Sequence, residues 1–436
     1  MHKIFSILII LAFLSSCSSK EKIDDKGAVS VFLHDKNEIT ADKSLAKAKI
    51  SVPKQQNNRT WYGVNPNVRT ENFAFAKKIS KIDSFKAGKD SGYDFEKVFA
   101  PIIAEGKIYS LDSKGNLFAR NLSDGKKIWQ RRIIKKKWFV ENYDNGRISY
   151  FDGKIFATNA ENLVFCFNAE NGDLIWRRAF SSLPISAPIS DGNQVFFITN
   201  DNKTYALDEK NGKIDWIHEG IDKITGILGA AKPMIYKNYL VSAYSSGEIY
   251  ALSKQNGQAG WVFDLNVNKA SSSDFLLNDI DASPVVKEGI VYAVGNGGLM
   301  LAIRMQDGVV LWQRAISSIA NFWMAGDFIY VIDNDAKLIC LQRESGKVAW
   351  VNQLKKYDGK KKPKNHIVYF GVLMAGDNLV LTNSKNELLL ASPSDGKILQ
   401  KKKLPGKVFS TPIVVDKKMY LHALGRFYGT KLLVIE

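Results

Sequence analysis

Cysteine is scarce in this sequence, and several other features are missing. The 436 residues include 3 cysteines, 11 prolines and 5 histidines. Three cysteines cannot supply the disulfide framework of a small secreted scaffold. So little proline, together with 32 glycines, excludes collagen-like and linker-like chains. Apart from one N-terminal stretch, no apolar run approaches the roughly 18 residues of a membrane-spanning helix, which excludes a polytopic membrane protein.

Acidic residues are also fewer than basic ones. Lys and Arg number 61 against 44 Asp and Glu, a net charge of +17, while 45% of the residues are hydrophobic and can form a core. Runs of basic residues stand at Arg131–Arg132, Lys135–Lys137, Lys360–Lys362 with Lys364, and Lys401–Lys403. They suit solvated loops, anionic lipid head groups or an acidic partner surface. Nucleic acid is not expected, because the chain begins with a secretion signal.

Residues 1–17, MHKIFSILIILAFLSSC, have the layout of a bacterial lipoprotein signal. Lys3 gives a positive start, Ile4–Leu14 form an apolar region of signal-peptide length, and Leu14–Cys17 match a lipobox. Several acyl chains on Cys17 would anchor the chain stably, whereas a single chain is marginal. Ser18, in place of the aspartate that marks inner-membrane lipoproteins, favours the periplasmic face of the outer membrane. An ordinary signal peptide with an incidental cysteine is the alternative.

These features divide the N-terminal part of the chain. We predict a lipoprotein signal peptide over residues 1–16. A lipidated flexible tether is predicted over residues 17–60, where polar residues and charges of both signs show weak hydrophobic periodicity.

The rest of the chain repeats one signature. Glycine stands four residues before each of six tryptophans: Trp129, Trp176, Trp216, Trp261, Trp312 and Trp350. A seventh copy, Asp395-Gly396, carries Gln400 in place of tryptophan. The distance from Trp129 to Gln400 divided by six steps gives a mean period of about 45 residues. This is the length of one blade of a β-propeller.

Each repeat also has the internal spacing of a four-stranded blade. Fourteen residues before the Trp or Gln stands Gly or Asn, with Ala336 as the exception. Gly and Asn tolerate the left-handed backbone of a tight hairpin. The Asp/Asn-Gly pairs mark a second hairpin, and segments such as Ala187-Pro188-Ile189 supply the first strand. Four antiparallel strands per unit are typical of a propeller.

An eighth unit begins at Thr411-Pro412, and the chain ends before its fourth strand. Because an open edge invites aggregation, we expect a strand within Asn72–Ser80 to complete it. The predicted fold is therefore all-β: an eight-bladed β-propeller of four-stranded antiparallel blades over residues 61–436, with an N-terminal strand completing the last blade. Cys166 and Cys340 occupy one small buried position in opposite blades, so no disulfide joins them.

With this signal, lipobox and set of eight units, the chain resembles the BamB family, lipoproteins of the machinery that inserts β-barrels into the outer membrane. The resemblance implies a non-enzymatic scaffold without cofactors, a monomer within a hetero-complex. It would contact the periplasmic POTRA domains of a BamA-like barrel subunit and aid the insertion of unfolded outer-membrane protein precursors. The family's contact positions fall on Thr225, Ile227, Leu228, Asp279 and Asp281.

The contact positions lie in two crossings between units. The crossing and the middle hairpin of an antiparallel blade emerge on one face, so both segments are expected on one docking surface. The basic runs follow outer strands and are expected near crossings in another sector. Leu228 stands where the family has a basic residue, which removes the basis for a salt bridge there. Asp279 and Asp281 can alternatively be read as turn caps.

A pyrroloquinoline-quinone enzyme is the rival class, since quinoprotein dehydrogenases share the Gly-to-Trp repeat. Such enzymes typically use a vicinal Cys-Cys disulfide and a calcium site, which needs six to eight oxygens. The sequence has no adjacent cysteines, and Asp333-Asn334-Asp335 suits a hairpin turn better than a metal site. We therefore predict no enzyme activity and no metal. A propeller that binds another envelope protein or a polysaccharide, with Trp61, Trp138 or Trp323 stacking on sugars, remains the further alternative.

Overall fold

The computed structural model describes residues 39–45, 48–62, 70–89, 100–112, 114–134, 147–221, 231–265, 279–359, 365–425 and 429–436. The chain separates into two units, Met1–Glu38 and Ile39–Glu436. The predicted signal peptide and Cys17 therefore lie outside the described residues. Among the residues that the structure describes, no helical segment could span a lipid bilayer.

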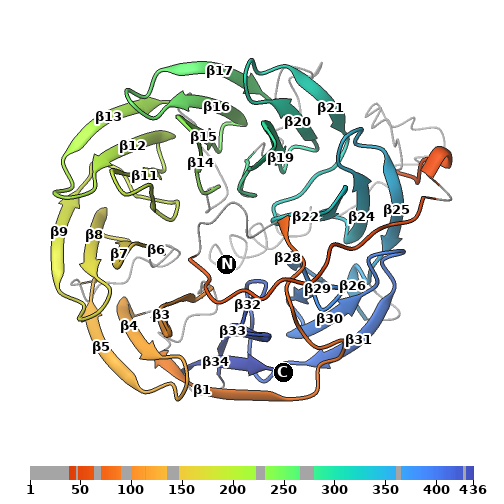
Figure 1. Ribbon diagram of the computed structural model, residues 1–436, viewed down its shortest axis with the longest axis horizontal. Coiled ribbons are helices and arrows are strands. Elements are labelled where there is room, and N and C mark those ends of the chain that lie inside the picture. Colours follow the sequence, from red (N-terminus) through yellow and green to blue (C-terminus); the bar gives the residue numbers. More distant parts are fainter. Residues whose placement is uncertain are drawn as a thin grey trace, which may run out of the picture. The chain divides into compact units, whose positions relative to one another are not determined.

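Eight four-stranded antiparallel sheets build the second unit, and they follow one another around a ring (Figure 1). This confirms the predicted propeller. Blades 1 to 4 consist of β2 (Ile102–Ala104), β3 (Lys107–Leu111), β4 (Asn116–Asn121) and β5 (Lys127–Arg132); β6 (Ile148–Phe151), β7 (Lys154–Thr158), β8 (Leu163–Asn168) and β9 (Leu174–Ala179); β10 (Ile189–Ser190), β11 (Gln194–Ile198), β12 (Lys203–Asp208) and β13 (Ile214–Glu219); and β14 (Met234–Tyr236), β15 (Tyr239–Ala243), β16 (Glu248–Ser253) and β17 (Ala259–Asp264).

Blades 5 to 8 continue the same pattern. They consist of β18 (Val285–Lys287), β19 (Ile290–Val294), β20 (Met300–Arg304) and β21 (Val310–Arg314); β22 (Trp323–Ala325), β23 (Phe328–Ile332), β24 (Lys337–Gln342) and β25 (Val348–Gln353); β28 (Tyr369–Ala375), β29 (Asn378–Asn383), β30 (Glu387–Ala391) and β31 (Ile398–Lys403); and β32 (Ile413–Val415), β33 (Lys418–Leu424), β34 (Gly429–Ile435) and β1 (Ile82–Lys89). A short 3-10 helix, η1 (Lys43–Leu45), and a small hairpin of β26 (Tyr357–Asp358) and β27 (Asn365–His366) lie outside the blades.

The middle hairpins, between the second and third strands of a blade, confirm the predicted left-handed turns. All seven residues at the predicted position have positive φ: Gly115, Asn162, Asn202, Gly247, Gly298, Ala336 and Asn386. Ala336 has φ of 61° although it is neither Gly nor Asn. The hairpin geometry therefore overrides the residue preference in blade 6.

The six tryptophans in register join neighbouring blades. Each indole Nε1 donates a hydrogen bond to a backbone carbonyl of the next blade, as in Trp129 to Ala169 at 3.0 Å and Trp312 to Arg343 at 2.9 Å. The ring lies against the glycine that stands four residues before the Trp or Gln of the next blade, and a Cβ on Gly346 would come within 2.5 Å of the Trp312 ring. Glycine is therefore required at this position both by its positive φ and by the ring beside it.

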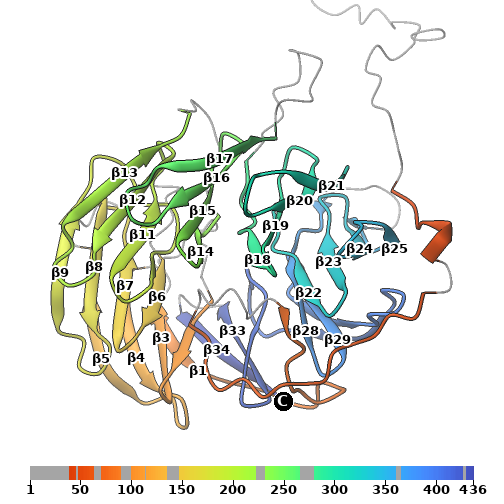
Figure 2. The same cartoon turned by 45° about the horizontal axis from the view of Figure 1, so that its top comes forward.

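The ring closes through the N-terminal strand, but the predicted segment was wrong. The closing strand is β1, which pairs antiparallel with β34 from Ile82–Ile435 to Lys89–Gly429, at the lower edge of Figure 2. Residues 72–80 do not form that strand. Their apolar residues, among them Phe73 and Ile79, are buried in the core instead. The sequence of β1, IDSFKAGK, is less apolar because an outer strand buries little of its surface.

The second half of the predicted flexible tether also differs from expectation. Asp42 N–H donates to Val348 O at 2.8 Å, and Asn58 Nδ2 donates to Val414 O at 2.8 Å. Trp61 forms an antiparallel bridge with Ile103 of β2. Residues 39–45 and 48–62 thus pack on the blades, where backbone groups of Asp42 and Trp61 and the side chain of Asn58 find partners that a tether would leave to water.

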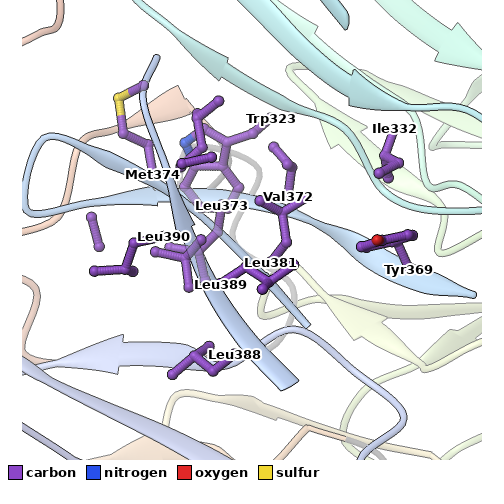
Figure 3. Close-up of a cluster of buried hydrophobic side chains, with 14 of the residues drawn as sticks. Trp323, Ile332, Tyr369, Val372, Leu373, Met374, Leu381, Leu388, Leu389 and Leu390 are labelled. Carbon is purple, nitrogen blue, oxygen red and sulfur yellow. The ribbon is translucent and has the colours of Figure 1, made fainter. Parts of the chain in front are cut away.

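The largest buried cluster spans blades 6 to 8 and takes in the N-terminal segment. Figure 3 shows Leu373, Leu381 and Leu389 of blade 7 gathered beside Trp323 of blade 6. Trp323 is only 3% exposed, and its Nε1 donates to Glu71 O at 2.8 Å. It is therefore unavailable for the sugar stacking considered from the sequence, while Trp138 lies outside the described residues.

Candidate docking face

One face of the ring is defined by the crossings between blades together with the middle hairpins, and we call it the crossing face. In six blades, the residue four places after the Trp or Gln donates its backbone N–H to the carbonyl of the positive-φ hairpin residue. The pairs are Ile133–Gly115, Phe180–Asn162, Gly220–Asn202, Leu265–Gly247, Leu354–Ala336 and Leu404–Asn386. Each of these crossings therefore starts beside its own middle hairpin, as the strand order requires.

Asn202, at the middle hairpin of blade 3, ties that hairpin to the crossing and to blade 4. Its Nδ2 donates to Ile221 O at 2.8 Å, just before the predicted contact segment. Its Oδ1 accepts from Ser245 Oγ at 2.8 Å in the hairpin of blade 4. One amide side chain therefore fixes three backbone segments on the crossing face.

Glu248 fixes the same crossing from blade 4. The side chain is 3% exposed, and its Oε2 accepts from Ile221 N–H at 3.1 Å and from Ser246 Oγ at 2.8 Å. Its Oε1 accepts from Tyr250 OH at 2.9 Å. Burial, with the added effect of this hydrogen bond, raises the pKa of Tyr250 to about 12. A buried carboxylate with three donors is a stable structural element.

His218 lies between blades 3 and 4, with its ring 4.6 Å from that of Tyr250. Burial lowers the pKa of His218 from its ordinary value of 6.5, so the ring is neutral at pH 7. The tyrosine pKa is raised and the histidine pKa is lowered. Both shifts favour the neutral form of the side chain.

A second set of contacts lies over blades 5 and 6. Asp279 O accepts from Asn296 N–H at 2.9 Å, and Asn296 Oδ1 accepts from Asn334 Nδ2 at 2.7 Å. Ser317 Oγ donates to Asn296 O at 2.6 Å. The Asp279 segment is thus held on the middle hairpin of blade 5, which is in turn held to that of blade 6.

The crossings into blades 4, 5 and 6 are joined to one another. Ala231 N–H donates to Ile280 O at 3.3 Å, and Lys232 N–H donates to Ser283 Oγ at 2.9 Å. Ser283 N–H donates to Asn321 Oδ1 at 3.0 Å. Together with the Asn202, Glu248 and Asn296 contacts, these bonds form a hydrogen-bonded belt over blades 3 to 6.

The predicted contact residues fall on this belt in different ways. Thr225, Ile227 and Leu228 lie outside the described residues, between Ile221, which is 61% exposed, and buried Ala231. Asp279 is 0% exposed, while Asp281 is half-buried. The structure therefore describes the residues that flank the first predicted segment, and it describes Asp279 and Asp281 of the second.

Several residues of the belt were not identified from the sequence. Asn202 and Asn334 were considered only as hairpin residues, and Glu248 received no role. A polar side chain next to a middle hairpin in neighbouring repeats is the signal that could have drawn attention to them. The placement of the basic runs was also wrong in part: Arg131–Arg132 and Lys401–Lys403 lie within β5 and β31 instead of following them, and the other two runs lie outside the described residues.

Comparison with known proteins gives one consistent family. A family model described as outer membrane protein assembly factor BamB matches residues 135–352. The outer membrane protein assembly factor BamB of Yersinia pestis is 24% identical over 349 residues, which cover 79% of this chain and 86% of that protein.

Solved structures share the fold. The crystal structure of BamB from Moraxella catarrhalis aligns with a TM-score of 0.67 at 18% identity and covers 82% of this chain and 100% of that one. A europium-containing methanol dehydrogenase aligns with a TM-score of 0.68 at 12% identity, covering 86% and 98% of the two chains. At such identities the likeness establishes the propeller fold alone.

Proposed function

This chain belongs to the BamB family, and from that membership we propose that it is a non-catalytic scaffold lipoprotein of outer-membrane protein assembly. In this proposal, lipidated Cys17 anchors the chain at the periplasmic face of the outer membrane. The crossing face docks on the POTRA domains of a BamA-like barrel subunit. The protein acts as a monomer within that hetero-complex and orients the barrel subunit for insertion of unfolded precursors.

The observation that carries the proposal is the belt over blades 3 to 6. Loops that bind a partner lose conformational freedom, and loops already fixed in the free protein lose less of it. Asn202 and Glu248 hold the start of the Thr225–Leu228 crossing, and Asn296 holds the Asp279 segment. The two predicted contact segments therefore leave the blades from preorganised, neighbouring positions.

The two aspartates have different roles in this proposal. Asp281 is half-buried, with its Oδ1 buried, and in this proposal it would face a basic group of the partner. Asp279 is fully buried and sets the shape of the segment through its contact with the blade 5 hairpin. Thr225, Ile227 and Leu228 would supply a mainly apolar contact next to exposed Ile221.

Described residues of the N-terminal segment pack away from the belt. They contact turns on the face opposite the crossings: Gln55 Nε2 donates to Asp377 Oδ2 at 2.9 Å, and Asp416 N–H donates to Asn58 O at 2.8 Å. Asp377 and Asp416 lie in turns between the first and second strands of their blades.

The cysteines support the absence of thiol chemistry in this proposal. Cys166 and Cys340 are both free and buried. Burial raises the pKa of the Cys166 thiol to about 12 and also raises that of Cys340. Because the thiolate is the reactive form of cysteine, both residues serve as small core side chains.

The test is affinity purification from detergent-solubilised membranes with Asp281→Arg. We expect wild type to retrieve the barrel subunit, and Asp281→Arg to retrieve at least tenfold less while circular dichroism shows that the variant is still folded. Asp173→Arg is the matched control, since Asp173 is an exposed aspartate in a turn on the opposite face. Asp279→Arg is unsuitable because it would bury a cation.

Each result has a distinct meaning. Equal retrieval by wild type and both variants would remove Asp281 from the site while leaving the partner in place. Failure of folded wild type to retrieve the barrel subunit would overturn the scaffold proposal as a whole.

A second role has one specific observation in its favour. The outer strands are edge strands of their sheets, and several carry exposed apolar residues, including Leu174 and Ile175 on β9 and Ile217 on β13. Such an edge can take up an extended precursor strand by backbone pairing. A photo-crosslinking residue at Ile175 should then capture a barrel precursor, whereas one at exposed Lys210, in a turn, should not. Equal capture at both positions would contradict this role.

A further inference from the structure

The seam between blades 8 and 1 contains a cavity of about 410 Å³. One wall is β1, the strand contributed by the N-terminal part of the chain, through Lys86 and Gly88. The other wall is blade 1, whose lining residues are Asp112, Lys114, Asn116, Phe118, Arg120, Gln130 and Arg132. Because its walls come from two blades that only the seam brings together, we call it the seam cavity.

The charge of the seam cavity is strongly unbalanced. It is lined by four cationic residues, Lys86, Lys114, Arg120 and Arg132, and by one carboxylate, Asp112. Asp112 Oδ1 accepts from Lys114 N–H at 3.0 Å and from Asn116 N–H at 2.8 Å, which uses this carboxylate within its own turn. Among the ion pairs of the described residues, none involves any of the four cations.

Arg120 shows that blade 1 departs from the repeat at this wall. Arg120 directly follows Ala119, the residue of β4 that pairs with Trp129. The other six repeats carry buried apolar residues there: Phe167, Leu207, Leu252, Ile303, Leu341 and Ala391. Arg120 Nη1 donates to Gly125 O at 3.2 Å and Nη2 to Ala87 O at 3.3 Å, so the guanidinium already bridges blade 1 and β1. Its buried Nε has no hydrogen-bond acceptor.

We infer that the seam cavity binds a phosphate group and that the bound anion holds β1 onto blade 1. Arg and Lys are the side chains that recognise phosphate, through charge-assisted hydrogen bonds. Four like charges around one cavity repel each other, and an anion between them relieves that repulsion. Since β1 supplies Lys86 and blade 1 supplies the other three cations, binding couples to closure of the ring. This inference is independent of the docking proposal.

The test is hydrogen exchange of the β1 amides, residues 82–89, in the full lipidated chain reconstituted into phosphatidylcholine vesicles. Inorganic phosphate is titrated at constant ionic strength. A ligand that binds only the closed seam slows exchange by the factor 1 + [L]/Kd, or about tenfold at a phosphate concentration ten times Kd. The amides of β17 in blade 4 serve as the internal reference. A parallel sample in vesicles that contain phosphatidylglycerol presents a lipid phosphate instead.

The test variant is Lys86→Gln/Lys114→Gln, which removes one cation from each wall and leaves Arg120 in place. The matched control, Lys210→Gln/Lys213→Gln, removes two exposed lysines from a turn of blade 3. We expect phosphate to protect β1 in wild type and in the control, but not in the test variant. Protection by phosphatidylglycerol vesicles alone would assign the phosphate to a lipid head group. No protection of wild type by either source, or equal protection of both variants, would overturn the inference.

Discussion

The joints between blades 1 to 7 and the seam around blade 8 solve the same packing problem in different ways. At each of six joints, a tryptophan lies on the glycine of the next blade and donates to its backbone. At the seam, Gln400 replaces tryptophan, and it exchanges hydrogen bonds with Ile79, donating to its O at 3.1 Å and accepting from its N–H at 2.8 Å. Phe85 of β1 takes the ring position against Gly125.

The difference follows from chain connectivity. A blade whose four strands are consecutive has an Asp/Asn-Gly turn that can receive a tryptophan from the blade before it. Blade 8 takes its outer strand from the N-terminal side of the chain, so it has no such turn between β34 and β1. At this joint, glutamine can hydrogen-bond to the backbone of the N-terminal segment, which a tryptophan ring would not do in the same way.

Removing a register tryptophan should have the largest effect. Trp312→Ala deletes a ring that is 7% exposed, together with its hydrogen bond to Arg343 O. We expect the free energy of unfolding to fall by about 3–5 kcal/mol, as for other buried aromatic residues. Chemical denaturation monitored by circular dichroism measures this change. Leu399→Ala, at a position 61% exposed on β31, should cost less than about 0.5 kcal/mol; similar costs for the two variants would contradict the proposed role of the tryptophan joint.

Substitution of the glycine that a tryptophan ring contacts should have the second-largest effect. In Gly346→Ala, a methyl group meets the Trp312 ring at 2.5 Å on a backbone with φ of 64°. We expect a loss of about 2–4 kcal/mol, from the positive φ and the overpacking together. Gly153→Ala is the matched control, because its φ is 72° but a Cβ there meets nothing within 4 Å. A loss of only about 1 kcal/mol is expected for it, and equal losses would show that the ring contact contributes nothing.

A substitution at Gln400 should destabilise the protein less than one at a tryptophan joint, and its effect should be confined to the residues near β1. Gln400→Ala leaves the backbone groups of Ile79 without their partner, at a cost of about 1–3 kcal/mol. Hydrogen exchange should accelerate in residues 79–89 and remain unchanged in the outer strand of blade 4. Gln313→Ala, an exposed glutamine on β21, is the control and should change neither. Uniform acceleration over all blades would mean that the seam does not open separately.

The smallest expected effect is a change in the pH dependence of stability, through a carboxylate at the joint between blades 3 and 4. Asp191 is half-buried between blades 3 and 4, and burial by itself raises its pKa. Hydrogen bonds from Lys254 Nζ and from the backbone N–H groups of Gln194 and Asn193 outweigh burial, so the pKa lies below the ordinary 3.8. A carboxylate with a lowered pKa stabilises the fold fully above its unfolded pKa, and this contribution is lost as the pH falls through the folded value.

Asp191→Asn should therefore lose stability at pH 7 and lose less on acidification below about pH 4 than wild type does. Thermal unfolding at a series of pH values measures the difference. Asp173→Asn, which removes an exposed carboxylate from another turn, should follow the wild-type curve. If Asp191→Asn also followed it, the Asp191–Lys254 contact would have no part in the acid response.

Much of the propeller followed from the sequence because each blade is built from local spacing. The glycine four residues before Trp176 and the left-handed residue at Asn162 set two hairpins whose strands are consecutive. The small position at Cys166 and Cys340 was also recognised, since a register position has the same surroundings in every blade. Segment boundaries outside the repeat were less predictable: β1 was expected about ten residues too early.

The sequence by itself determined the period, the turns and the ring, because these depend on residues a few positions apart. Only the tertiary structure decided how the chain ends meet. The pairing of β1 with β34, the exchange between Gln400 and Ile79, and the cations around the seam cavity join residues more than 300 positions apart or on unrelated segments. It also decided that Asp279 is buried while Asp281 reaches the surface. No local pattern encodes such contacts, since their energies arise only when distant segments are brought together.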